Sequence, residues 1–170
     1  MIKKYWIELL VFGAVFAVLI IDLAPSLTWI NTDSDGAHYL LAAKYMMTAH
    51  NTSAPLFLLL GRLFLFLPFG SEAWRLGLIS VLATTGCTVL IYMVVRHHLI
   101  DNPKARLYAI IASLIYGGSA LVISQSTIIE SYALSTMLSV GAYYCAIKKK
   151  WILVSVIIGL IWAVHTIFAW

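Results

Sequence analysis

Two aspartates separated by one residue are the first side chains in this sequence that could do chemistry. They occur in the run Thr32-Asp33-Ser34-Asp35-Gly36, directly before a segment whose apolar residues have helical spacing. A carboxylate at the start of a helix can act as a general base toward a hydroxyl group. Two carboxylates at this spacing can also hold a divalent cation that carries phosphate. The structural alternative is capping of the helix, because Asp is a common N-cap residue.

Four further ionisable residues are candidates for binding a substrate. Arg75 follows Trp74 and suits a lipid phosphate, although an interfacial anchor has the same pattern. Glu130 and His165 fall inside apolar runs, where an ionisable side chain is costly and indicates a functional site. An interhelical hydrogen bond would also explain His165. His50 could bind phosphate or position a substrate, and its alternative is an ordinary loop histidine.

The composition places these residues in a membrane protein. Of the 170 residues, 62% are hydrophobic and 11% are charged, and the mean hydropathy is +0.96. A soluble domain has about 45–50% apolar and roughly 25% charged residues, so lipid must supply the apolar surroundings. The net charge of +4 comes from short basic clusters between apolar runs, which is typical of topology signals rather than of a nucleic-acid-binding surface. Cys87 and Cys145 are interpreted as buried apolar side chains.

The apolar runs predict an all-α, polytopic transmembrane helical bundle of about five spans, forming a single membrane domain over residues 1–170. A span needs about 20 helical residues. The runs of this length are 5–24, 74–95, 107–124, 127–147 and 151–170. Run 55–69 is shorter and carries Arg62, which costs about 2.5–3.5 kcal/mol at the centre of a span, so an interfacial helix is favoured. It shares a long outer loop with a second interfacial helix over 36–48.

The basic clusters predict the orientation of this bundle. With five spans, clusters at 3–4, 96–106 and 148–150 share one side, which the positive-inside rule makes cytoplasmic together with the N-terminus. The outer loop and Glu130 then lie at the extracytoplasmic face, with His165 near the outer end of the last span. A purely structural membrane protein has no need for such a one-sided polar surface.

Short motifs occur in a fixed order along the chain. They are Asp35 with Tyr39; His50, Pro55 and Leu56; Leu60–Phe64; Trp74, Arg75 and Ser80; Gln125, Glu130, Tyr132 and Leu134; and Gly159, Leu160 and His165. In this order the chain resembles the N-terminal part of the protein O-mannosyltransferase-like membrane family, within the GT-C glycosyltransferase superfamily. Two positions depart from the family pattern, since Asn51-Thr52-Ser53 replaces Pro-Pro-Gly and Gly77 replaces an expected Asn.

The resemblance implies an inverting GT-C glycosyltransferase module. It would transfer a sugar from a polyprenyl-phosphate donor to a hydroxyl acceptor, on a protein or a lipid, at the extracytoplasmic face. Asp35 would be the catalytic base, because its spacing to Tyr39 favours it over Asp33. The implied substrate-binding residues are Asp33, His50, Arg75, Glu130 and His165, with Glu130 orienting one of the cations. The resemblance assigns no definite cofactor, and a divalent cation held by Asp33 and Asp35 is the alternative.

The alternative function is a non-catalytic structural subunit of a membrane complex built on the same fold. The chain ends at Trp170 inside an apolar run, which predicts a truncated or split enzyme, or one that a second chain completes. The enzyme hypothesis requires Asp35, Arg75 and Glu130 to face one outer cavity, whereas the subunit hypothesis expects them to be separated or covered. A transporter is disfavoured, because the cytoplasmic halves of the spans nearly lack polar residues.

Overall fold

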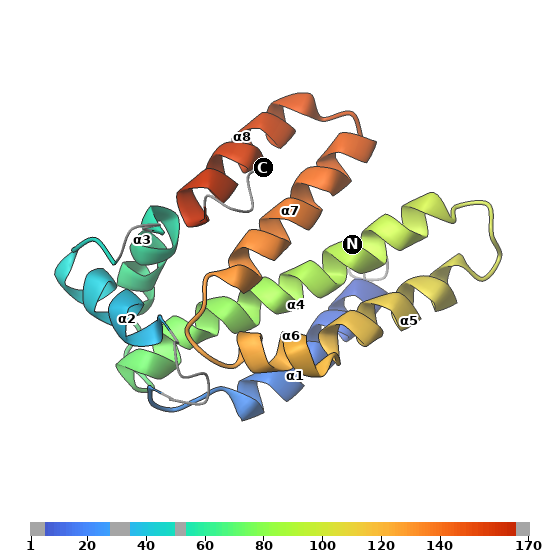
Figure 1. The fold of residues 1–170 in the computed structure, drawn as a ribbon. Helices are drawn as coiled ribbons and strands as arrows, with labels where there is room; N and C mark the ends of the chain where they lie inside the picture. Colours follow the sequence, from blue (N-terminus) through green and yellow to red (C-terminus); the bar gives the residue numbers. More distant parts are fainter. Residues whose placement is uncertain (1–5, 28–34, 50–53, 166–170) are drawn as a thin grey trace.

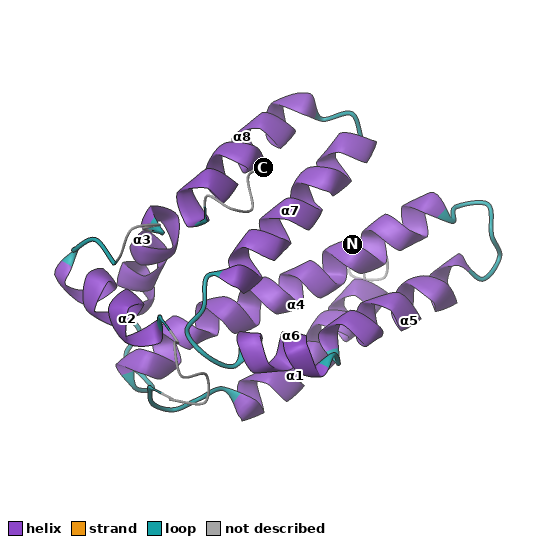
Figure 2. Cartoon of the chain, viewed as in Figure 1, coloured by secondary structure: helices purple, strands orange, loops and turns teal. Residues whose placement is uncertain are grey.

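The computed structural model describes residues 6–27, 35–49 and 54–165. Over these residues the chain forms eight helices and no strand, which confirms the predicted all-α class (Figure 1, Figure 2). The helices are α1 (Trp6–Asp22), α2 (Gly36–Tyr45), α3 (Pro55–Phe64), α4 (Glu72–His98), α5 (Ala105–Gly117), α6 (Ala120–Ser126), α7 (Tyr132–Ile147) and α8 (Trp151–Val164).

Helix α4 is the axis of the bundle. Helices α1, α5 and α7 pack along it, α8 packs on α7, and α2 and α3 gather near its N-terminal end (Figure 1). Its 27 residues correspond to a length of about 40 Å. Ser71 caps the start of α4 by accepting a hydrogen bond from the Trp74 N–H at 3.0 Å. Basic residues in the last turn complement the negative end of the helix dipole.

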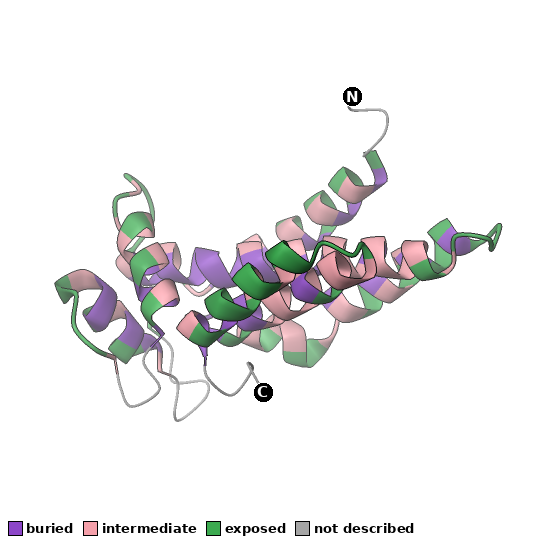
Figure 3. Ribbon diagram, turned by 90° about the horizontal axis from the view of Figure 1, so that it is seen from above, coloured by how far each residue is buried: buried purple, intermediate pink, exposed green. Residues whose placement is uncertain are grey.

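Large apolar side chains cover much of the outer surface of the bundle. Helix α1 buries a single stripe against its neighbours, formed by Ile7, Val11, Val15 and Leu19. A spacing of four residues keeps these side chains on one helix face. The other faces of α1, and the outer faces of α5 and α8, expose large apolar residues (Figure 3). Helices that are apolar on their outer as well as their inner faces are typical of a lipid environment.

Helix lengths do not support the five predicted spans. Within the described residues, α4 is long and apolar enough to cross a membrane, and a second span is added if α5 and α6 form one bent span. Helices α7 and α8 have 16 and 14 residues, or about 24 and 21 Å. Both lengths fall short of a hydrocarbon core of about 30 Å.

Two of the predicted spans are interrupted for identifiable reasons. The helix expected over 107–124 breaks after Gly117, and α6 departs from the axis of α5 by 59°. The helix expected over 127–147 begins at Tyr132 instead. The Thr127 carbonyl accepts a hydrogen bond from the Ala24 N–H at 2.9 Å, and the backbone of Glu130 bonds to a side chain of α4. Residues 127–131 therefore pair with other elements rather than extend α7.

Helices α2, α3 and α8 end earlier than the sequence predicted, whereas α4 extends beyond the predicted 74–95 at both ends. Helix α2 ends at Tyr45 rather than 48, where Met46 turns the chain with φ 56°. Helix α3 ends at Phe64 rather than 69, because Pro68 disfavours helix in the residue before it. Gly70, with φ 73°, then completes the turn into α4. Helix α8 ends at Val164, and the remainder of the predicted 151–170 span beyond His165 lies outside the described residues.

The close approach of α5 to α1 predicts that Gly117 is intolerant of larger side chains. A Cβ at Gly117 would lie 2.9 Å from the Cγ2 of Val15, whereas a Cβ at Gly159 meets nothing within 4 Å. Gly117→Leu should therefore lower the free energy of unfolding by about 1–3 kcal/mol through overpacking. Gly159→Leu is the matched control and should be neutral or stabilising. Thermal unfolding in detergent measures both, and equal melting temperatures would contradict the packing described.

Candidate functional site

The connection between α6 and α7 carries Glu130 into the interior of the bundle. Glu130 is 5% exposed. The Ser80 hydroxyl, fully buried on α4, donates to the Glu130 carbonyl at 3.0 Å and accepts from the Glu130 N–H at 3.3 Å. Both polar groups of the Glu130 backbone are thus bound to the central helix. The position of the carboxyl group is therefore fixed by α4 and not by α7.

The start of α2 lies directly on this connection. The Glu130 carboxylate accepts hydrogen bonds from the backbone N–H groups of Asp35 and Ser131. One turn into α2, the Tyr39 hydroxyl forms a hydrogen bond of 3.3 Å with the Ser131 hydroxyl. These contacts bring Asp35 and Glu130, separated by most of the chain, into one site.

The Asp35 side chain does not cap α2. Asp35 occupies the N-cap position with φ −70° and ψ 0°, and its carboxylate forms no capping hydrogen bond. The residue is partly exposed, in contrast to the buried Glu130. The capping role considered from the sequence is therefore not the one that the structure gives this carboxylate.

The surroundings of Glu130 raise the pKa of its carboxyl group. Burial raises the pKa of Glu130 to about 7, the negative charge of Asp35 raises it as well, and the two backbone hydrogen bonds oppose the shift. Glu130 precedes α7 and lies outside the helices. Close to neutral pH its carboxyl group is therefore divided between the protonated and ionised forms. Burial is also the main cause of a raised pKa of Tyr39, so its hydroxyl remains a hydrogen-bond donor.

His165 joins the site from the end of α8. It directly follows the last helical residue and is 8% exposed. Its ring lies 5.6 Å from the ring of Tyr132, with an interplanar angle of 42°. Tyr132 opens α7 two residues after Glu130 and interacts electrostatically with both Glu130 and Asp35. The structure thus gathers three of the predicted site residues: Asp35, Glu130 and His165.

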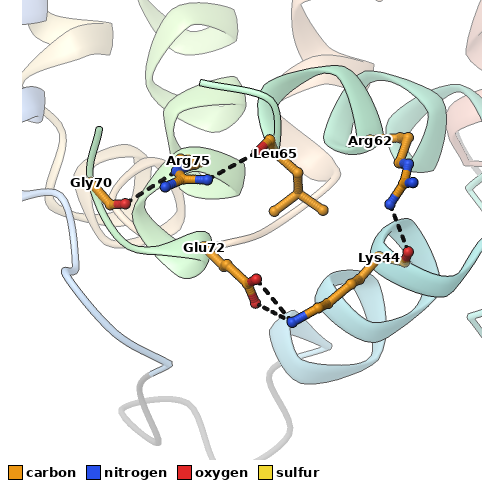
Figure 4. Close-up of polar contacts among 6 residues, drawn as sticks. All are labelled: Lys44, Arg62, Leu65, Gly70, Glu72 and Arg75. Carbon is orange, nitrogen blue, oxygen red and sulfur yellow. Dashed lines mark hydrogen bonds and ion pairs between the residues drawn. The ribbon is translucent and has the colours of Figure 1, made fainter. Parts of the chain in front are cut away.

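Arg75 has a different environment from these three residues. It lies in the first turn of α4 and points into the turn that follows α3 (Figure 4). Its Nε donates to the carbonyls of Phe69 and Gly70 at 3.0 and 3.1 Å, and its Nη1 donates to the Leu65 carbonyl at 2.9 Å. These bonds tie the α3–α4 turn to the start of α4. The guanidinium therefore has a structural role that the sequence did not indicate.

Two other cations near this turn are engaged in similar contacts. The Lys44 ammonium pairs with the Glu72 carboxylate at 2.9 and 3.0 Å, joining α2 to α4 (Figure 4). The Arg62 guanidinium on α3 donates to the Lys44 carbonyl at 2.7 Å. Together with Arg75 they hold α2, α3 and the start of α4 together, which positions Asp35 at the beginning of α2.

The other predicted site residues, Asp33 and His50, lie outside the described residues. The predicted cation site needs both Asp33 and Asp35, and because Asp33 is not described, the structure does not describe that site. In the ranges that the structure describes, no group of three or more His, Cys, Asp or Glu side chains is placed to hold a metal ion.

Several residues of the site were not assigned a role from the sequence. Ser80, Tyr39 and Tyr132 belong to the motifs quoted above, so the sequence marked these residues. It did not show which residues they contact. Ser131 had no such signal, because a lone serine beside a glutamate is common in any loop. Its contribution depends on the tertiary contact with Tyr39.

Comparison of the sequence with known families identifies the family of this chain. Residues 35–169 match the family model described as Protein O-mannosyl-transferase TMEM260 N-terminal domain. The chain belongs to this family. The match begins at Asp35 and spans Arg75, Glu130 and His165, so it covers the whole described site. The family is by its description one of protein O-mannosyl-transferases, and the resemblance found in the sequence is confirmed. Neither a curated protein nor a solved structure gave a match.

The raised pKa of Glu130 predicts a pH-dependent stability. The folded pKa of about 7 lies above the ordinary value of 4.5. Its contribution is therefore fully present below about pH 4.5 and is lost as the pH rises through 7. Between pH 5 and 8, wild type should lose roughly 1–3 kcal/mol relative to Glu130→Gln, measured as the difference in their thermal unfolding curves. A difference that does not change with pH would contradict the burial of this carboxyl group.

The contacts of Arg75 predict a loss of stability on conservative substitution. Lysine cannot reproduce the fork of donors that reaches three carbonyls. Arg75→Lys should lower the free energy of unfolding by about 1.5–3 kcal/mol. Arg106→Lys, at an exposed position on α5, serves as the control and should change the melting temperature little. An unchanged melting temperature for Arg75→Lys would mean that these bonds are not needed for the turn.

Proposed function

We propose that this chain is the membrane module of a glycosyltransferase that moves mannose from a polyprenyl-phosphate donor to a hydroxyl group of a protein. Membership of a protein O-mannosyl-transferase family supports the sugar and the acceptor. The observation that carries the proposal is the pairing of Asp35 with Glu130. One partly exposed carboxylate, not used for capping, stands beside a buried carboxyl group whose charge is suppressed.

Asp35 is the general base in this proposal. It accepts the proton of the acceptor hydroxyl as the hydroxyl oxygen attacks the anomeric carbon of the sugar. The bond from that carbon to the phosphate oxygen breaks, and the polyprenyl phosphate leaves with the electron pair. Because attack and departure occur on opposite faces of the sugar, the configuration inverts, as a GT-C mechanism requires.

Glu130 and His165 act as binding and positioning residues. Glu130 holds the backbone of Asp35 through its N–H, so it fixes where the base stands. The His165 ring lies against Tyr132 at the same site and is a candidate to bind the sugar or the phosphate. Arg75 and His50 remain candidates for the phosphate, although the described donors of Arg75 already bind carbonyls.

An apolar groove beside Tyr132 supports a lipid-linked donor. The groove has a volume of about 170 Å³ and runs between α4, α6 and the start of α7. Leu121, Val122 and Ala133 contribute apolar walls, and Gln125 lies among them. A polyprenyl chain entering here would place its phosphate near Tyr132 and His165. The apolar area that the donor buries increases with the length of its polyprenyl chain.

We place the chain in the membrane as an integral protein that crosses the bilayer several times, with the candidate site at the extracytoplasmic face. The exposed apolar faces of α1, α5 and α8 support immersion in lipid. The α4–α5 and α7–α8 connections share one end of the bundle, opposite α2 and α3 (Figure 1). Those two connections carry the basic clusters, so the positive-inside rule makes that end cytoplasmic.

Removal of the base predicts loss of transfer. In proteoliposomes supplied with labelled polyprenyl-phosphate mannose and a protein acceptor, Asp35→Asn should lower the rate about 10²- to 10⁴-fold, because the hydroxyl proton loses its acceptor. Asp101→Asn removes an exposed carboxylate from the α4–α5 connection and is the matched control, with an unchanged rate expected. Equal rates for wild type and Asp35→Asn would exclude Asp35 as the base.

The same assay distinguishes an enzyme from a structural subunit. A folded wild-type chain that transfers no sugar alone, but does so when a partner chain is added, would be a module completed by that partner. In that complex Asp35→Asn separates the two hypotheses. Loss of transfer places the catalytic base in this chain, and full transfer makes the chain a non-catalytic subunit.

A further inference from the structure

A cavity lies at the opposite end of the bundle from the candidate site. It has a volume of about 260 Å³ and opens between the start of α1 and the ends of α4 and α7. Its polar lining consists of Glu8, Tyr92, Arg96, His97, Tyr144 and Lys148. A second cavity of about 290 Å³, lined also by Arg106, shares Arg96 with it. A single water occupies about 30 Å³ in the liquid, so the first cavity holds a larger group than water.

Tyr92 indicates that this cavity takes a polar ligand. Its side chain is fully buried on α4, among Ile7, Val11 and Ala109. Its hydroxyl oxygen is buried and has no hydrogen-bond partner among the described residues, and Tyr92 is one of the residues that line the cavity. A buried hydroxyl without a partner costs about 1–3 kcal/mol, so such groups are normally satisfied. An acceptor atom in the cavity would remove this cost.

The charged side chains show which kind of acceptor fits. The Arg96 guanidinium approaches the Glu8 carboxylate only to 3.6 Å. That exceeds the roughly 2.7–2.9 Å of a charge-assisted hydrogen bond, so the ion pair is loose. The Lys148 ammonium lies 3.0 Å from the Nδ1 of His97. An ammonium can only donate, so His97 accepts there and its other ring nitrogen carries the proton.

The cavity therefore presents donors and an excess of positive charge. Arg96, Lys148, the second nitrogen of His97 and the Tyr92 hydroxyl are all available as donors, against the single carboxylate of Glu8. A phosphate group supplies several acceptor oxygens and the opposite charge. Basic pockets between helices at a membrane surface bind phosphate-bearing headgroups on these grounds.

We propose that this cavity binds the phosphate of an anionic phospholipid headgroup in the leaflet that faces the basic end of the bundle. The Arg96 guanidinium and the Lys148 ammonium pair with the phosphate oxygens, and the Tyr92 hydroxyl donates to one of them. The exposed apolar faces of α1 and α5, which lead away from the cavity, accommodate the acyl chains. The site is separate from sugar transfer and does not rest on the proposed function.

Thermal unfolding in mixed micelles tests the lipid site. Phosphatidylglycerol at about ten times its dissociation constant should raise the melting temperature of wild type by roughly 3–6 °C over the same amount of phosphatidylcholine. Arg96→Gln and Lys148→Gln should each lose at least half of this shift. Lys150→Gln removes an equal charge from an exposed position outside the cavity and should retain the shift.

Tyr92→Phe provides a variant that does not depend on charge. Without phosphatidylglycerol its melting temperature should equal or exceed that of wild type, because the unpartnered hydroxyl is gone. With phosphatidylglycerol it should gain a smaller shift than wild type. A purely structural tyrosine would show no such difference between the two lipids.

Three results would overturn the proposal. Equal melting temperatures of wild type in the two lipids would mean that no anionic site exists. An equal loss of the shift in Lys150→Gln and Lys148→Gln would show attraction to diffuse surface charge. The third measurement adds inorganic phosphate to the protein in lipid-free detergent and records the melting temperature. If it gives the full shift with the same dependence on Arg96, and phosphatidylglycerol adds nothing, the ligand is free phosphate rather than a lipid.

Discussion

The hydrogen bonds between Ser80 and the backbone of Glu130 determine where the candidate site forms. An irregular backbone segment inside an apolar bundle leaves N–H and C=O groups that must find partners, since burying them unpaired is costly. Ser80 supplies both partners for Glu130, and the Ala24 N–H supplies one for Thr127. Because those partners come from α4 and from the end of α1, the segment can enter the bundle only where these helices meet.

The same central helix carries the other polar contacts of the interior. Thr84 on α4 shares a 2.6 Å hydrogen bond with Ser126 at the end of α6, and both side chains are almost fully buried. Thr85 and Thr88 bond back to carbonyls of their own helix, so their hydroxyls are satisfied without a partner element. Thr84 and Ser80 on α4 therefore form hydrogen bonds to neighbouring segments, whereas Thr85 and Thr88 do not. The segments held in this way are α6 and the connection that carries Glu130.

The fold class and the approximate helix positions could be predicted from the sequence, because each helix is an apolar run bounded by polar or turn residues. The break between α5 and α6 was missed although Gly117, Gly118 and Ser119 mark it in the sequence, because the apolar residues on both sides continue the run to the length of one span. The late start of α7 has a different origin, because the hydrogen bonds of residues 127–131 to other elements leave no periodic pattern. Helix existence is a local property, whereas the start of α7 inside an apolar run is a tertiary one.

The site residues divide in the same way. Asp35, Glu130 and His165 were predicted to share one face, because the five-span topology put the outer loop, the start of the fourth span and the end of the fifth on the same side. The carbonyl partners of Arg75 carry no side-chain signal, so the sequence could not distinguish a phosphate ligand from a turn-stabilising residue. The places of Asp33 and His50 in the site remain predictions, as both lie outside the described residues.

The charges of the two ends of α4 suit opposite tasks. At the candidate site the described cations Lys44, Arg62 and Arg75 are engaged by a carboxylate or by carbonyls, while the carboxyl groups of Asp35 and Glu130 lie together. Two neighbouring carboxyl groups favour a positive charge, whereas the end of α4 that carries Arg96 favours an anion.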